Sequence, residues 1–160
     1  MNDISVKDFF EKHNACESGV AWAKRNVKSG MMSEAYDKLL AKAKIVKGQE
    51  NAAYDYLWWV MSNAWDDKTL RLISVRMVRE TPLPDGRKVV DLLTDQRSLN
   101  ALDVAERFAN GNATLEELAA ARAASWDASW DAARAASWDA AWAEQVKIIA
   151  YFGNPFKGES

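Results

Sequence analysis

Residues 125–142 read SWDASWDAARAASWDAAW, and this segment decides the fold. Four tryptophans stand in it at steps of four, eight and four residues: Trp126, Trp130, Trp138 and Trp142. Three of them are followed directly by an aspartate, namely Asp127, Asp131 and Asp139. Because one turn of α-helix takes about 3.6 residues, this spacing predicts a helix with a stripe of indole rings on an alanine background.

The rings of this stripe drift around the helix. Each four-residue step advances about 40°, so the four rings together sweep about 160°. A stripe this wide needs two neighbours to cover it, or one partner along which it winds. Three interpretations stay open: a core covered by the earlier helices, an exposed docking surface, or an interface between copies of the chain. The candidate partner-binding residues are Trp126, Asp127, Trp130, Asp131, Trp138, Asp139 and Trp142.

The rest of the chain indicates further helices. Side chains suited to cap a helix N-terminus precede apolar runs at Ser5, Asp66 or Asp67, Asp95 and Thr114. Residues 87–93 suit a short helix or a short strand, and no stretch shows sustained strand alternation. We expect an all-α fold in which about six to seven helices pack on one long Ala/Trp-rich C-terminal helix. A single domain over 1–153 and a flexible tail over 154–160 complete this prediction.

Composition narrows the class of protein. A chain of 160 residues can bury the core of one domain, and eight tryptophans are many for this length. The net charge of −2 argues against binding to nucleic acid. The N-terminus lacks the basic and apolar regions of a secretory signal, and no apolar run is long enough to cross a membrane. We therefore expect a soluble, intracellular protein with no membrane partner.

Residues that carry chemistry are sparse. His13 and Cys16 could supply half of a metal site or a nucleophilic pair, but the chain has no second histidine or cysteine. A structural histidine and a buried thiol are the favoured interpretation. The aspartates of the tryptophan stripe are expected to border solvent. The glycines form no phosphate-binding loop. We therefore expect no cofactor, no metal and no catalytic residues.

A basic cluster on the helix that follows Asp66 offers an alternative site. Its arginines are Arg71, Arg76 and Arg79, and aromatic side chains precede them at Trp58 and Trp59. Such residues could bind a small nucleotide by ion pairing with phosphate and stacking on the base. Ordinary surface charge explains the same pattern.

Two motifs carry a resemblance. Residues 12–23 read KHNACESGVAWA, and residues 95–111 read DQRSLNALDVAERFANG before a capping turn and the alanine-rich segment. This arrangement resembles a group of small Ala-rich helical proteins of phages and bacteria, some described as immunity proteins. The resemblance implies an all-helical protein, borne by a phage or mobile element, that binds and neutralises a target. It supplies no catalytic residues to carry over.

The leading hypothesis is a non-enzymatic protein that inhibits a bacterial defence or toxin component by direct contact, as an anti-CRISPR protein does. Its partner would be a bacterial protein, and the chain would act in the bacterial cytoplasm, alone or as a homodimer. The alternative is a nucleotide-signal sponge that sequesters a small nucleotide second messenger. A third hypothesis, an enzyme using His13, Cys16 and carboxylates, stays open.

Overall fold

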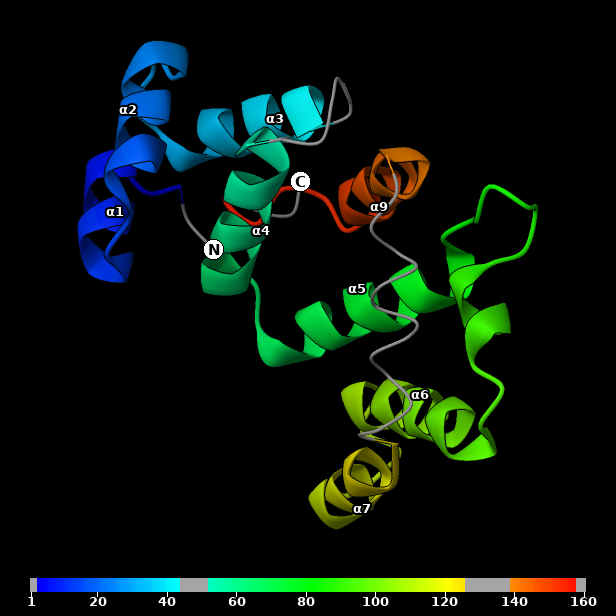
Figure 1. The fold of residues 1–160 in the computed structure, drawn as a ribbon. Coiled ribbons are helices and arrows are strands. Elements are labelled where there is room, and N and C mark those ends of the chain that lie inside the picture. The colour runs from blue at the N-terminus through cyan, green and yellow to red at the C-terminus, as the bar shows by residue number, and fades with distance from the viewer. Residues whose placement is uncertain (1–2, 44–51, 126–138, 158–160) are drawn as a thin grey trace. The chain divides into compact units, whose positions relative to one another are not determined.

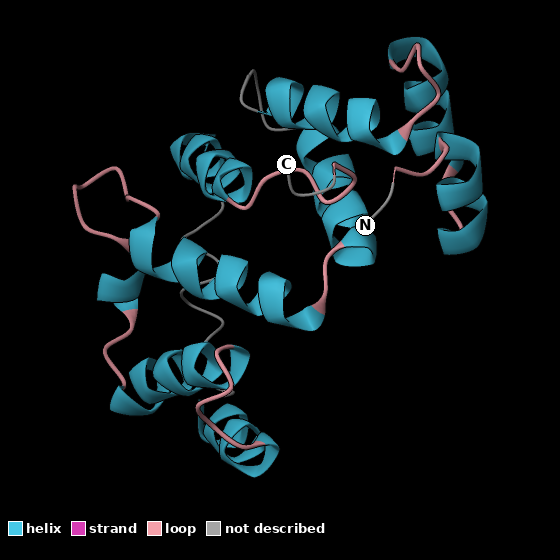
Figure 2. Ribbon diagram, turned by 180° about the vertical axis from the view of Figure 1, so that it is seen from behind, coloured by secondary structure: helices cyan, strands magenta, loops and turns pink. Residues whose placement is uncertain are grey.

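The computed structural model of this chain describes residues 3–43, 52–125 and 139–157. These residues form α-helices and one short 3-10 helix and contain no β-strand (Figure 1, Figure 2). The elements are α1 (Val6–His13), α2 (Glu17–Asn26), α3 (Met32–Ala43), α4 (Ala52–Ala64), α5 (Asp67–Glu80), η1 (Val89–Leu92), α6 (Gln96–Ala109), α7 (Leu115–Ser125) and α9 (Asp139–Tyr151). The all-α prediction is confirmed, and residues 87–93 contain the 3-10 helix η1 in place of a strand.

The predicted helix starts are confirmed by their hydrogen bonds. The Asp66 carboxylate accepts from the Thr69 amide at 2.7 Å, which selects Asp66 over Asp67 as the cap of α5. At α7 the Thr114 hydroxyl accepts from the Glu117 amide at 3.2 Å, and the Glu117 carboxylate accepts from the Thr114 amide at 2.7 Å. Caps of this kind satisfy backbone donors that have no partner inside the helix. Ser5 and Asp95 cap α1 and α6 in the same way.

The chain divides into two compact units. The N-terminal unit comprises Met1–Trp65 together with Gly153–Ser160, and the second unit comprises Asp66–Phe152. In the N-terminal unit α3 packs along α4, while α1 and α2 pack on α3. Its core contains large side chains that are almost fully buried, including Phe9, Met32, Tyr36, Leu57, Met61 and Phe156.

The segment after α9 belongs to the N-terminal unit although it was predicted to be a flexible tail. Pro155 and Phe156 are buried, and the Phe156 ring lies edge-on to Phe9 with 5.3 Å between ring centroids. The Asn154 amide donates to the Ser33 carbonyl oxygen at 2.9 Å. Residues 154–157 therefore complete the core of the N-terminal unit, a contact that spans more than a hundred residues of sequence.

The second unit is a succession of helices. Figure 1 shows α9, α5, α6 and α7 one after another, and each packs against the next. Val104 of α6 is buried against Leu118 and Ala121 of α7. The predicted long C-terminal helix is described only at its two ends, where α7 packs against α6 and α9 against α5. Residues 126–138 lie outside the described residues, so the single long helix and the number of helices around it stay predictions.

None of the helices in the described ranges is both long enough and apolar enough to cross a membrane.

Candidate functional site

The tryptophan stripe lies for the most part outside the described residues. Trp126, Asp127, Trp130, Asp131 and Trp138 lie outside the described residues. Asp139 and Trp142 lie in α9, and Asp139 is its first residue. The stripe therefore stays a predicted partner-binding surface.

The residues of the alternative nucleotide site are distributed over both units. Trp58 and Trp59 lie on α4 of the N-terminal unit, and the three arginines lie on α5 of the second unit. The Trp59 ring meets Phe9 and Phe10 edge-on, with centroids 5.8 Å and 5.7 Å away. The Trp58 ring lies 6.2 Å from that of Tyr54. Both indoles thus take part in packing within the N-terminal unit.

Each of the three arginines has a carboxylate partner inside the second unit. Arg79 bridges α5 to α6 by ion pairs with Asp103 at 2.5 Å and Glu106 at 2.9 Å. Arg76 pairs with Glu80 at 2.7 Å. The guanidinium of Arg76 also lies 3.9 Å from the centre of the Tyr151 ring. These contacts give both cations a structural role in joining helices.

The third arginine, Arg71, forms a longer and weaker ion pair. Its guanidinium is 3.9 Å from the Asp67 carboxylate and lies 5.1 Å from the centre of the Phe108 ring. The carboxylates that pair closely with Arg76 and Arg79 would compete with a nucleotide phosphate for these two side chains.

His13 and Cys16 have separate neighbours. The His13 ring packs on Phe9 with 4.5 Å between centroids, which fits a structural histidine. The prediction of a buried thiol is wrong, because Cys16 is the N-cap residue of α2 and is exposed. Its Sγ lies 3.3 Å from the Ser18 hydroxyl, and this hydrogen bond, with that of the Gly19 amide, lowers the pKa of the thiol. Within the described ranges no three histidine, cysteine or carboxylate side chains gather as metal ligands would.

A concave surface of the N-terminal unit lies between α1 and α2 and is here called the α1–α2 groove. It has a volume of about 860 Å³. Its floor is apolar and consists of Val6, Phe10, Ala15, Val20, Ala23 and Val27. Charged side chains of both helices also line it, namely Lys7 and Glu11 of α1 and Lys24 of α2.

Backbone contacts fix the walls of this groove. The Val6 amide donates to the Gly30 carbonyl oxygen at 2.8 Å, and the Met32 amide donates to the Ile4 carbonyl oxygen at 2.9 Å. At the other end of α1 the chain reverses at Asn14, which has a φ of 54° in the left-handed region. Asparagine tolerates this conformation better than most residues, so a tight turn into α2 can form without glycine.

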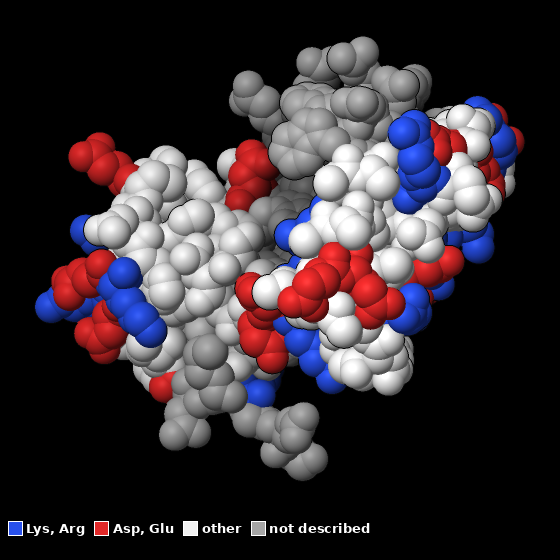
Figure 3. Space-filling view, turned by 90° about the horizontal axis from the view of Figure 1, so that it is seen from below, with Lys and Arg blue, Asp and Glu red and all other residues white. Residues whose placement is uncertain are grey.

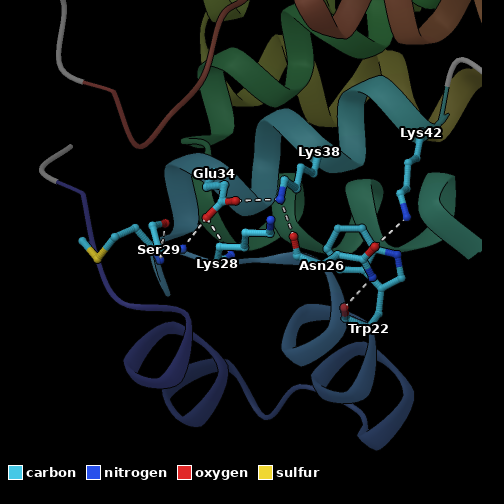
Figure 4. Close-up of polar contacts among 8 residues, drawn as sticks. Trp22, Asn26, Lys28, Ser29, Glu34, Lys38 and Lys42 are labelled. Carbon is cyan, nitrogen blue, oxygen red and sulfur yellow. Dashed lines mark hydrogen bonds and ion pairs between the residues drawn. The ribbon is translucent and has the colours of Figure 1, made fainter.

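A polar cluster holds the corner between α2 and α3 (Figure 4). The Glu34 carboxylate accepts from the backbone amides of Lys28 at 2.9 Å and Ser29 at 2.6 Å, and pairs with Lys38 at 2.6 Å. Lys38 also donates to the Asn26 carbonyl oxygen at the end of α2. The ion pair with Lys38, followed by the bonds from Ser29, lowers the pKa of Glu34 strongly. This cluster fixes the end of α2 relative to α3, and it thereby positions the wall of the groove that α2 forms.

A second hollow, here called the inner cavity, lies among α1, α2, α3 and α4. It has a volume of about 230 Å³. Four aromatic side chains line it, namely Phe10, Trp22, Tyr56 and Trp59. Its remaining apolar lining includes the buried residues Met32, Ala35, Leu39 and Val60. The exposed lining residues Cys16 and Asp55 mark where the cavity meets solvent.

Surface charge is mixed. On the face drawn in Figure 3, lysine and arginine lie interspersed with aspartate and glutamate, and no extended region of one sign forms. This face therefore lacks the basic surface that binding to a nucleic-acid backbone needs.

Comparisons with known proteins give no further guide to the site: no family model, curated protein or solved structure matches this chain. The resemblance to immunity proteins stays a prediction. Sequence reasoning overlooked both hollows, although one signal was present. Gly19 and Ala23 lie four residues apart on α2, and Gly19 lines the inner cavity whereas Ala23 lines the groove. Small residues at this spacing leave one side of α2 without bulky side chains.

Proposed function

We propose that this protein is a non-enzymatic binding protein that docks an amphipathic helix of a partner protein in the α1–α2 groove. The observation that carries the proposal is the make-up of the groove, an apolar floor bordered by charges from both helices. Protein interfaces combine an apolar centre with a polar rim in this way. A groove between two helices is also a recurrent receptor for the apolar face of a third.

The charges of the groove favour a partner helix with acidic residues. Lys24 is exposed, and none of the ion pairs among the described residues includes it. Lys7 pairs with Glu11 at 3.9 Å, and both side chains remain largely exposed, at 79% and 68%. The lining thus carries one more cation than anions, which suits a carboxylate beside the apolar face of the incoming helix.

The resemblance to immunity proteins suggests the concrete form of this function. The partner would be a component of a bacterial defence or toxin system, and docking would block its action as an anti-CRISPR protein does. The alternative of a nucleotide-signal sponge has less support, since its arginines already hold carboxylates.

The test compares two charge reversals on neighbouring residues of α2. Lys24→Glu changes a residue that lines the groove, whereas Arg25→Glu makes the same change on an exposed residue outside it. Partners are captured from a bacterial lysate with each variant and identified by mass spectrometry. The captured protein's acidic amphipathic helix is then made as a peptide and titrated. We expect Lys24→Glu to weaken peptide binding about tenfold, and Arg25→Glu to change it less than about twofold.

A third variant, Val20→Trp, fills the floor of the groove and should abolish capture. Capture that is unaffected by both Lys24→Glu and Val20→Trp contradicts the proposal. A homodimer that Val20→Trp dissociates, seen by light scattering, would assign the groove to a second copy of this chain and would also contradict it.

A further inference from the structure

The geometry points to a second binding site: the inner cavity binds a small neutral aromatic molecule of the indole or phenol class. This inference goes beyond the docking of a partner helix, because the cavity is lined by residues of α3 and α4 that the groove lacks, although Phe10 and Ala15 line both hollows. It rests on the size of the cavity, the chemistry of its walls and the residues at its mouth.

The inner cavity is large enough to hold a small ligand and is larger than an ordinary packing defect. Protein interiors hold few voids larger than a water molecule. An apolar cavity of about 150 Å³ stays dry and takes up benzene. The inner cavity, at about 230 Å³, has room for one substituted ring or two fused rings. Larger polycyclic molecules exceed it.

The walls favour a flat aromatic ligand. Two pairs of aromatic side chains line the cavity, and the two rings within each pair are in edge-to-face contact. The centroids of Phe10 and Trp59 are 5.7 Å apart, and those of Trp22 and Tyr56 are 6.3 Å apart. Aromatic rings prefer edge-to-face or offset contacts at such distances, so a further ring placed among them gains the same contacts. The buried Ala35 of α3 adds no bulk to the opposite lining.

The mouth selects a ligand that can donate one hydrogen bond. Among the described residues that line the cavity, Asp55 is the one carboxylate, and it is exposed and therefore able to accept a hydrogen bond. The Cys16 thiol, which also lines the cavity, already interacts with Ser18. An indole N–H or a phenol O–H supplies the donor that Asp55 lacks, while the ring enters the apolar interior.

The experiment uses the full chain with indole and phenol as probes, and benzene as a ring without a donor. We expect saturable binding of indole by calorimetry with a dissociation constant of about 0.1–1 mM, and weaker binding of benzene. A four-ring hydrocarbon should not bind. Indole at ten times its dissociation constant should also raise the melting temperature.

Two variants separate this site from the groove. Ala35→Leu fills the inner cavity and should weaken indole binding at least tenfold. Val20→Trp fills the groove and should leave the dissociation constant for indole within about twofold of that of the unmodified protein. Ala35→Leu should in turn leave binding of the partner helix unchanged. Failure of one proposal is therefore distinguishable from failure of the other.

Cys16 gives a readout in the unmodified protein, should Ala35→Leu fail to fold. It is the chain's single cysteine, so methyl methanethiosulfonate reports on this mouth alone. Bound indole should slow its modification about two- to fivefold. Absence of saturable indole binding, indole binding that Val20→Trp abolishes, or a modification rate that saturating indole leaves unchanged would each overturn the inference.

Discussion

Replacing Phe156 by alanine tests whether the end of the described chain is part of the core. The Phe156 side chain is 1% exposed, and its ring centroid lies 5.3 Å from that of Phe9 and 6.4 Å from that of Tyr36. Truncation of a buried phenylalanine costs about 3–5 kcal/mol through lost apolar burial and the cavity left behind. Domains of this size unfold with about 5–15 kcal/mol, so the change removes a large part of the stability.

The loss is measurable by heat and by denaturant. For a chain of this length each kcal/mol moves the melting temperature by about 2–4 °C, so Phe156→Ala should lower it by about 6–20 °C. Unfolding in urea is followed by far-ultraviolet circular dichroism and by tryptophan fluorescence. Coincidence of the two curves justifies a two-state free energy.

Two controls isolate the ring. Phe156→Leu keeps most of the apolar volume and should cost less than about 1.5 kcal/mol. Lys157→Ala removes the adjacent ion pair with Asp37, at 2.6 Å between two well-exposed side chains, and should cost at most about 1 kcal/mol. If Phe156→Ala unfolds within about 0.5 kcal/mol of the unmodified protein, residues 154–157 behave as a loose tail and the packing argument is refuted.

Three smaller changes test local features. Thr114→Ala removes the cap of α7 and should cost about 1 kcal/mol in urea unfolding; an unchanged midpoint would show that the cap is dispensable. Gly19→Ala should stabilise the protein by about 0.5–1 kcal/mol, because the added Cβ meets only Cys16 Sγ at 3.5 Å, and a lower melting temperature would contradict this. Because the pKa of Glu34 is lowered from its ordinary value of 4.5, the ionised carboxylate stabilises the fold at pH values above 4.5, and this stability is lost as the pH falls further. Glu34→Gln should therefore make the stability depend less steeply on pH on the acid side. An equally steep acid loss in that variant would assign the effect to other carboxylates.

Local chemistry made the helix starts predictable. A capping side chain and the amide it bonds to are within three residues of each other, so the pattern is visible without the fold. Thr114 with Glu117 is an example, as is Ser5 with Asp8. The end of α5 at Glu80 likewise follows from the prolines that come after it.

Contacts between distant residues could not be predicted in this way. Phe156 meets partners far earlier in the chain, and nothing in its immediate sequence names them. The prediction that Cys16 is buried rested on the general tendency of cysteine to be buried. It was wrong because Cys16 is the N-cap residue of α2, where its side chain is exposed. Both hollows depend on where helices meet, so the spacing of Gly19 and Ala23 could indicate a side of α2 without bulky side chains but not what faces it.

The return of the chain to the N-terminal unit has a consequence for the order of biosynthesis. Phe156 follows Tyr36 by 120 residues and Phe9 by 147 residues, and a ribosome adds about 5–20 residues each second. The side chains of Phe9 and Tyr36 are therefore made well before the ring that covers them, with a delay of about 6–29 s. During this interval the apolar surface that later receives Phe156 is open to chaperones and to other nascent chains. Most of the N-terminal unit is thus translated before the second unit, yet its core closes only after the second unit has been synthesised.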